Sequence, residues 1–178
     1  MNLNLALACI PALTIALFGN PSDLHAAQSA KLTACSLITD GDAKEFAVGA
    51  FDRSSLSDTA CKIDVMADGF VVRYLYLTIS PLPPDIKDPN YARDSVSQRL
   101  KNDQQDGGKP LKCSITGATH FGCLDVASPM GSFKPGQRAA RVLLGKGNTV
   151  VELTVFHDKR PNLDMAKDLA EKVFKRLP

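Results

Sequence analysis

Four cysteines follow an apolar leader, and they constrain this chain more than any other feature. They are Cys35, Cys61, Cys113 and Cys123. An even number of cysteines in an exported chain predicts two disulfides, because the periplasm and the extracellular space are oxidising. Four cysteines allow three pairings, so the connectivity depends on the segments around each one. The chain is therefore expected to fold as a small, cross-linked domain.

The first 27 residues have the pattern of a secretory signal peptide. An apolar stretch from Leu3 to Phe18 is followed by the breaker pair Asn20-Pro21 and by the small residues Ala26-Ala27. The stretch is shorter than the roughly 20 residues that a membrane span needs. We expect residues 1–27 to be removed and residues 28–178 to form a single domain. No Lys or Arg precedes Lys31, so a leader retained as an anchor is the alternative.

Size and charge exclude several functions. About 150 residues remain after the leader, enough for one hydrophobic core. The formal net charge of the whole chain is only +2. The chain has no Lys/Arg-rich run with interleaved aromatics and no zinc-finger spacing, so nucleic acid is not an expected partner. We expect a periplasmic or secreted protein without a transmembrane span in its mature form.

Two segments in the first half of the mature chain have clear periodicity. Thr39 and Asp42 form a variant capping box, and the apolar residues after them, between 43 and 50, recur at helical spacing. From Cys61 the period changes to alternation, which passes through the turn signal Asp68-Gly69 into "FVVRYLYLTIS". This pattern predicts a hairpin, whose second strand is apolar on both faces and therefore central in its sheet.

The second half repeats these signals. A second helix is expected from Asn90 to Asp106, where Gly107-Gly108 ends it. Two hairpins follow, one from Leu111 to Val126 and one from Arg138 to His157, and residues 161–178 have the pattern of an amphipathic helix. Runs of hairpins predict an antiparallel sheet rather than a parallel one. The fold class is therefore α+β, with helices packed against a sheet built from hairpins.

Three segments carry a resemblance to a known group of proteins. "ACSLITDGDAKEFAVG", "CKIDV" and "DLAEKVFKRLP" resemble secreted and lipoprotein domains of unknown function from bacteria, notably actinobacteria, and the order of elements is similar to that of Mog1 and PsbP-like domains. The resemblance implies pairing of Cys35 with Cys61. It also implies a binding or accessory role rather than an enzymatic one, and it brings no catalytic residues.

The segment "CSITGATHFGC" is interpreted as a stapled turn. Cys113 and Cys123 are equidistant from Ala118, the centre of the expected turn, so they would lie opposite each other in the hairpin. Ile115 would then face Phe121, and Thr116 would face His120. Opposite residues in an antiparallel pair are close enough for a disulfide.

Catalytic and metal-binding readings of the same residues are weaker. Zinc bound by Cys113, His120 and Cys123 would lack the usual paired spacing, and a free thiolate is not expected beside a disulfide partner. Ser114 and Asp158 could join His120 or His157 in a hydrolase, but no nucleophile motif accompanies them. We therefore expect no metal, no cofactor and no enzymatic activity, with a small hydrolase as an alternative.

A basic stretch supplies the candidate binding residues. Between Asp125 and Glu152 the chain has no acidic residue, and this stretch contains Lys134, Arg138, Arg141 and Lys146. It is either a solvated strand edge or a surface for a protein or a small anionic ligand. A loop at Ser128 to Gly136 precedes it.

The two arginines are three positions apart, so they must point to opposite faces of the sheet. We expect Lys134, Lys146 and one of the arginines to form the recognition surface. Charge reversal at the two lysines should then weaken binding with little change in melting temperature.

The most economical hypothesis is an exported, non-enzymatic binding or accessory domain of the bacterial envelope. An immunity or inhibitor protein that blocks a toxin or a cell-wall hydrolase is the alternative. A ligand-binding domain should have an apolar pocket between sheet and helices, whereas an inhibitor should have a solid core and a protruding loop.

Overall fold

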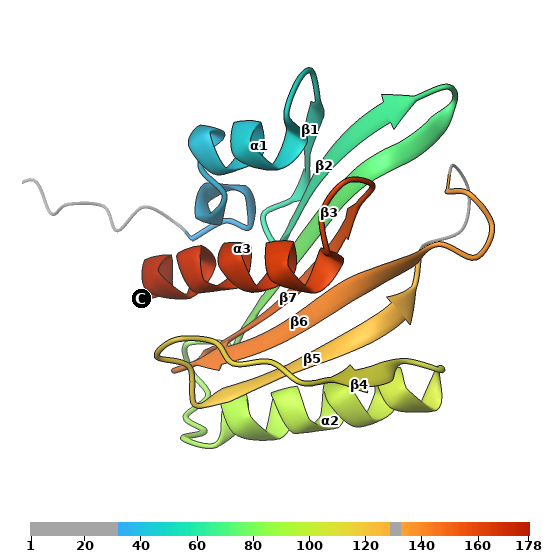
Figure 1. The fold of residues 1–178 in the computed structure, drawn as a ribbon. Helices are drawn as coiled ribbons and strands as arrows, with labels where there is room; N and C mark the ends of the chain where they lie inside the picture. The colour runs from blue at the N-terminus through green and yellow to red at the C-terminus, as the bar shows by residue number, and fades with distance from the viewer. Residues whose placement is uncertain (1–31, 129–132) are drawn as a thin grey trace, which may run out of the picture. The chain divides into compact units, whose positions relative to one another are not determined.

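One antiparallel sheet organises the computed structural model, which describes residues 32–128 and 133–178. Its seven strands have the order β1-β2-β3-β7-β6-β5-β4 (Figure 1). They are β1 (Asp52–Ser57), β2 (Ala60–Ala67), β3 (Phe70–Pro81), β4 (Lys109–Leu111), β5 (His120–Ala127), β6 (Arg138–Lys146) and β7 (Thr149–His157). The predicted signal peptide, residues 1–27, lies outside the described residues, and Leu32–Pro178 form one compact unit.

Three α-helices and one short 3-10 helix accompany the sheet. They are η1 (Cys35–Leu37), α1 (Asp40–Ala47), α2 (Tyr91–Gln105) and α3 (Asn162–Arg176). Thr39 closes the predicted capping box with Asp42 at the start of α1. None of the helices in the described part of the chain is long and apolar enough to cross a membrane. The predicted α+β class is confirmed.

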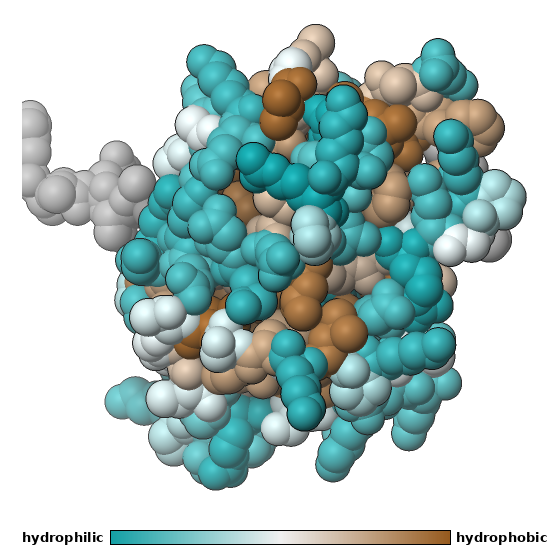
Figure 2. Space-filling model, viewed as in Figure 1, coloured by the Kyte–Doolittle hydropathy of each residue, from teal (hydrophilic) through white to brown (hydrophobic). Residues whose placement is uncertain are grey.

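The pleat of the strands separates the core into two layers. On β6, Val142 and Leu144 pack in the main core with Leu169 of α3, whereas Leu143 packs with Val96 of α2. Successive side chains of a strand point to opposite faces, so α3 and α2 cover opposite faces of the sheet. Hydrophilic residues cover most of the surface visible in Figure 2, and apolar residues there form small separate groups.

Both predicted disulfides are present. Cys35 pairs with Cys61 at a Cα–Cα distance of 4.9 Å, and Cys113 pairs with Cys123 at 6.1 Å. The first links the segment before α1 to β2, and the second fixes the loop before β5. Two disulfides indicate an oxidising compartment outside the cytoplasm.

The predicted register around the second disulfide is wrong. Cys123 lies opposite Leu111, and Cys113 lies outside the strands, in a loop that spans residues 112–119. The predicted pairs of Ile115 with Phe121 and of Thr116 with His120 are therefore absent from the sheet. β4 ends at Leu111, and Ile115 is buried in the main core instead of pairing in the sheet. Burial of that side chain outweighs continuation of the hairpin.

One strand was not predicted. β1 pairs with β2 at the edge of the sheet, with Asp52 opposite Asp64. Its sequence, "DRSSLS", lacks alternating apolar residues because most of it is exposed. The turn between β2 and β3 was predicted correctly, and Asp68 and Gly69 both have positive φ there, as a tight hairpin requires.

Candidate functional site

Part of the sheet has no helix on the side that carries α2. This helix packs mainly on β5, β6 and β7, so the same side of β2 and most of β3 remains uncovered among the described residues. We call the resulting surface the open face. Its residues come from strands β2, β3, β6 and β7 and from α2: Lys62, Asp64, Tyr74, Tyr76, Arg99, Arg141 and Glu152.

Strand register brings these side chains together. Asp64 lies directly opposite Tyr74, and Lys62 lies opposite Tyr76. The row that begins with Lys62 and Tyr76 continues through Thr154 to Arg141. Residues directly opposite in antiparallel strands have Cβ atoms about 5 Å apart, so each row is a line of touching side chains.

The charges of the open face are paired with one another. Lys62 Nζ lies 2.6 Å from Asp64, and Arg99 lies 3.7 Å from Glu152. Arg141 contacts Glu152 at 3.2 Å and Asp103 of α2 at 2.7 Å. Each cation of the open face therefore has a carboxylate partner. Positive and negative charges alternate on this surface and largely cancel one another.

Two tyrosines stand at the centre of the open face. The Tyr74 and Tyr76 rings are stacked with centroids 6.2 Å apart, and Phe133 contacts Tyr74 edge-on at 5.3 Å. Burial raises the pKa of Tyr74 to about 12, and the nearby Asp64 carboxylate adds to the shift. Tyr74 therefore remains a neutral O–H donor at any physiological pH. Among the described residues neither hydroxyl has a hydrogen-bond partner, so both are available to a bound molecule.

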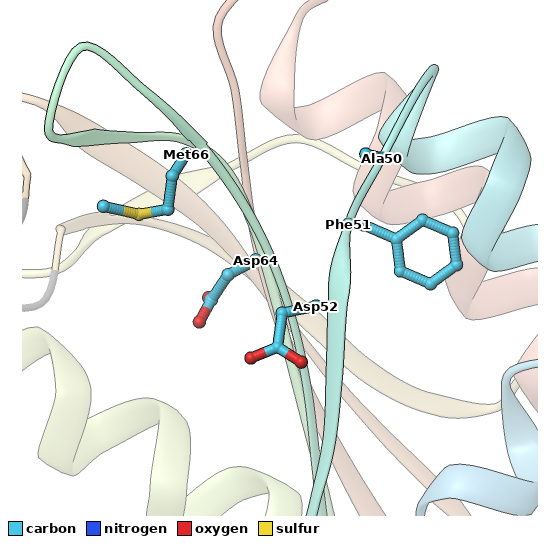
Figure 3. A pocket seen from close by; sticks show the side chains of 5 residues that line it. All are labelled: Ala50, Phe51, Asp52, Asp64 and Met66. Atoms are coloured by element: carbon cyan, nitrogen blue, oxygen red, sulfur yellow. The ribbon is translucent and has the colours of Figure 1, made fainter.

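A shallow depression adjoins the open face near the β2–β3 turn. It has a volume of about 350 Å³ and is lined by Ala50, Phe51, Asp52, Asp64 and Met66. Figure 3 shows the Asp52 and Asp64 carboxylates and the Met66 side chain on one side of the strands, with the Phe51 ring on the other. Like charges directly opposite in a sheet are destabilising, and the ion pair of Lys62 with Asp64 offsets part of this repulsion.

The four predicted basic residues do not form one surface. Lys134 lies over the Phe70 ring at 5.5 Å, whereas Lys146, at the end of β6, donates to the backbone carbonyl of Leu177 at 2.5 Å. Arg138 pairs with Asp125 at 2.6 Å on the face that α3 covers. Arg141 points to the opposite face, as predicted. Their role in binding stays a prediction, and residues 129–132 of the predicted loop lie outside the described residues.

The two histidines of the alternative hydrolase are far apart. His120 is at the start of β5 opposite Gly145, and His157 is at the far end of the neighbouring strands. The His157 side chain is only 2% exposed. The described residues contain no group of three or more His, Cys, Asp or Glu side chains arranged to hold a metal. The predicted absence of enzymatic activity stays a prediction.

No binding role was predicted for Tyr74 or Tyr76 from the sequence. Both lie on the second face of the strand that was correctly predicted to be central, and apolar character on two faces indicated burial on both sides. The available signal was the alternation of Lys62 and Asp64 with the apolar residues of β2. A polar face on one strand predicts that the neighbouring strand is exposed on the same side.

Comparisons with known proteins assign no family. No protein-family model matches the chain, and no curated protein matches its sequence. One solved structure resembles it, a crystal structure from Bacteroides thetaiotaomicron VPI-5482 at 1.50 Å resolution, with a TM-score of 0.40 and 13% identity. The match covers 68% of this chain, and the chain spans only 40% of that protein.

Proposed function

We propose that this chain is an exported, non-enzymatic binding domain of the bacterial envelope, periplasmic or secreted, and that it binds another protein on its open face. The observation that carries the proposal is the pair Tyr74 and Tyr76, stacked on a strand that no described helix covers on this side. Tyrosine and arginine are the residues most enriched at the energetic centres of protein interfaces. The open face has two tyrosines, Tyr74 and Tyr76, and two arginines, Arg99 and Arg141.

The open face favours a protein over a small anionic ligand. Its cations Lys62, Arg99 and Arg141 are already paired with carboxylates, so an anion would have to displace them. The adjoining depression is shallow, whereas sites for small molecules are concave and bury most of the ligand. A partner that supplies its own paired charges could dock without leaving any charge unpaired.

An immunity or inhibitor protein is a specific form of this proposal. The space between the sheet and α3 is filled by side chains less than 2% exposed, among them Leu75, Leu153 and Leu169. The β2–β3 hairpin extends beyond α3 (Figure 1), and Met66 and Phe70 beside its turn are 53% and 39% exposed. A rigid body whose open face is flanked by a projecting apolar hairpin suits binding in the groove of an exported toxin or a cell-wall hydrolase.

Site-specific photocrosslinking in the producing cells tests the proposal. A photoreactive phenylalanine derivative replaces Tyr76 in one variant and Lys175 in the control variant. Lys175 is exposed on α3, which covers the other face of the sheet. We expect a discrete protein adduct at Tyr76 that excess unlabelled wild-type protein competes away, and no such adduct at Lys175. Equal adducts at both positions, or an adduct at Lys175 alone, would contradict docking on the open face.

A further inference from the structure

A buried histidine lies beneath the C-terminal end of α1. The His157 ring packs edge-on against Phe46 of α1 with centroids 5.7 Å apart. Its Nδ1 accepts the backbone N–H of Lys159 at 3.0 Å, so the neutral ring carries its proton on Nε2. Nε2 is itself buried and makes no hydrogen bond of ordinary geometry within residues 32–128 and 133–178, although the Phe46 backbone lies close enough to influence the pKa of the ring. In the neutral ring Nδ1 already accepts the Lys159 N–H. A second proton can therefore bind to Nδ1 only if this hydrogen bond breaks.

A single carboxylate stands between this histidine and a buried arginine. Asp158 Oδ1 lies 3.0 Å from Arg73 Nε and 3.7 Å from His157 Nδ1. The guanidinium of Arg73, only 6% exposed as a residue, also donates to the carbonyls of Ala47 and Val48 at the end of α1. Asp158 is therefore the ion-pair partner of Arg73, and Arg73 in turn donates hydrogen bonds to the last carbonyls of α1.

That contact supports the helix end, together with the hydrogen bond from the Val48 backbone N–H to the Lys44 carbonyl. Val48 caps α1 with φ of +47°, in the left-handed region that β-branched residues rarely adopt. Its side chain is 63% exposed, so packing does not fix it. Hydrogen bonds from Arg73 to the carbonyls of Ala47 and Val48 satisfy backbone groups that the helix leaves without partners.

The charged groups around His157 disfavour its protonation. Burial lowers the pKa of His157, the charges of Arg73 and Arg160 lower it further, and Asp158 and the Phe46 backbone act in the opposite direction. From α3 the neutral side chain of Asn162 accepts the backbone N–H of His157, not a ring N–H. Arg138 of β6 is engaged with Asp125. Asp158 is therefore the carboxylate positioned to form an ion pair with His157 when the imidazole is protonated.

We propose that His157, Asp158 and Arg73 form an acid-sensitive latch at the end of α1. A proton from solvent adds to Nδ1, which can then no longer accept the N–H of Lys159 and becomes a donor. Asp158 is the nearest carboxylate, so it moves from Arg73 toward His157. Arg73 loses its counter-ion, is repelled by the imidazolium, and releases the carbonyls of Ala47 and Val48.

A pH titration by NMR of the wild-type protein tests the latch, with His157→Gln and His120→Gln as matched variants. Glutamine at 157 can accept the Lys159 N–H through its side-chain carbonyl but cannot be protonated near neutral pH. As His157 titrates, we expect the Lys159 amide and the Arg73 Nε–H signals to shift together. We also expect hydrogen exchange at Val48, corrected for pH, to accelerate several-fold. His157→Gln should abolish all three changes, and His120→Gln should leave them intact.

Two results would overturn the latch. One is a His157 titration that leaves the Arg73 Nε–H signal and exchange at Val48 unchanged. The other is a wild-type response that persists in His157→Gln. A further variant, Asp158→Asn, separates the steps, because it should retain the Lys159 shift and lose its coupling to Arg73. Coupling that survives in Asp158→Asn would exclude carboxylate exchange.

Discussion

The carboxylate of Asp42 in α1 accepts a hydrogen bond from the guanidinium of Arg176 in α3, with 2.6 Å between Oδ2 and Nη1. The same oxygen accepts the backbone N–H and the hydroxyl of Thr39 at 2.9 and 2.7 Å. Arg176 also donates to the Leu37 carbonyl. The first and last α-helices of the described chain are therefore joined through one buried acid.

Substitution of Asp42 by Ala should lower the free energy of unfolding by about 2–3 kcal/mol, because it removes a helix cap and the partner of a partly buried arginine. Urea denaturation measures the change. The matched control is Asp40→Ala, since the Asp40 side chain is 85% exposed although it also pairs with an arginine. The control should change stability by less than about 1 kcal/mol. Equal losses in both variants would show that Asp42 acts only as a surface charge.

Acid should remove the contribution of Asp42. Burial would raise the pKa of this carboxyl, but hydrogen bonds from Arg176 and Thr39 outweigh it and hold the pKa below its usual 3.8. A lowered pKa means that the stabilisation is complete above pH 3.8 and is lost as the pH falls through the folded-state value. Asp42→Asn should therefore flatten the dependence of melting temperature on pH below about 4. A slope identical to that of the wild type would exclude Asp42 as its source.

Each disulfide should contribute measurably to stability. In the chain-entropy account, closing loops with sequence separations of 26 and 10 residues is worth about 3.5 and about 2.7 kcal/mol, respectively. The paired variants Cys35→Ser with Cys61→Ser, and Cys113→Ser with Cys123→Ser, test this by denaturation. We expect the second pair to lose less, because Glu171 of α3 also holds Thr116 in the same loop. A greater loss from the second pair would contradict that ordering.

Lys146 should behave as a structural residue. It donates to the carbonyls of Leu177 and Phe174 at the end of α3 and lies 5.2 Å from the Phe174 ring. A cation at this position satisfies free carbonyls and complements the helix dipole. Lys146→Met should therefore lower the free energy of unfolding by about 1 kcal/mol. The expectation from the sequence that charge reversal leaves the melting temperature unchanged is kept only for Lys134, which is exposed, and there it stays a prediction. A melting temperature unchanged in Lys146→Met would contradict the capping role.

The main elements were predictable because they depend on periodicity and local turn chemistry. The Asp68-Gly69 turn, the cap at Thr39 and the amphipathic last helix are encoded within a few residues, and all three were predicted correctly. β1 and the register around Cys123 depend instead on contacts with distant segments. An exposed edge strand has no apolar alternation to detect, and the burial of Ile115 under α3 leaves no local signal.

The arginine contacts could not be predicted from the sequence, because they too join distant segments. Arg53 donates to the Cys35 and Ile38 carbonyls, Arg73 to those of Ala47 and Val48, and Arg176 to that of Leu37. Each joins residues separated by at least 15 positions in the chain. Charge patterning in a sequence identifies neighbours along one helix, and it does not identify a distant carbonyl.

The affinity of a Tyr76→Ala variant for the partner captured by crosslinking tests the central claim most directly. Calorimetry would compare it with the wild type and with Lys175→Ala, after equal melting temperatures have established that all three are folded. A tyrosine at the centre of an interface is worth about 2 kcal/mol or more, so we predict a dissociation constant about 30-fold higher for Tyr76→Ala. Lys175→Ala should bind like the wild type. Unchanged affinity in folded Tyr76→Ala would show that the partner binds elsewhere than the open face.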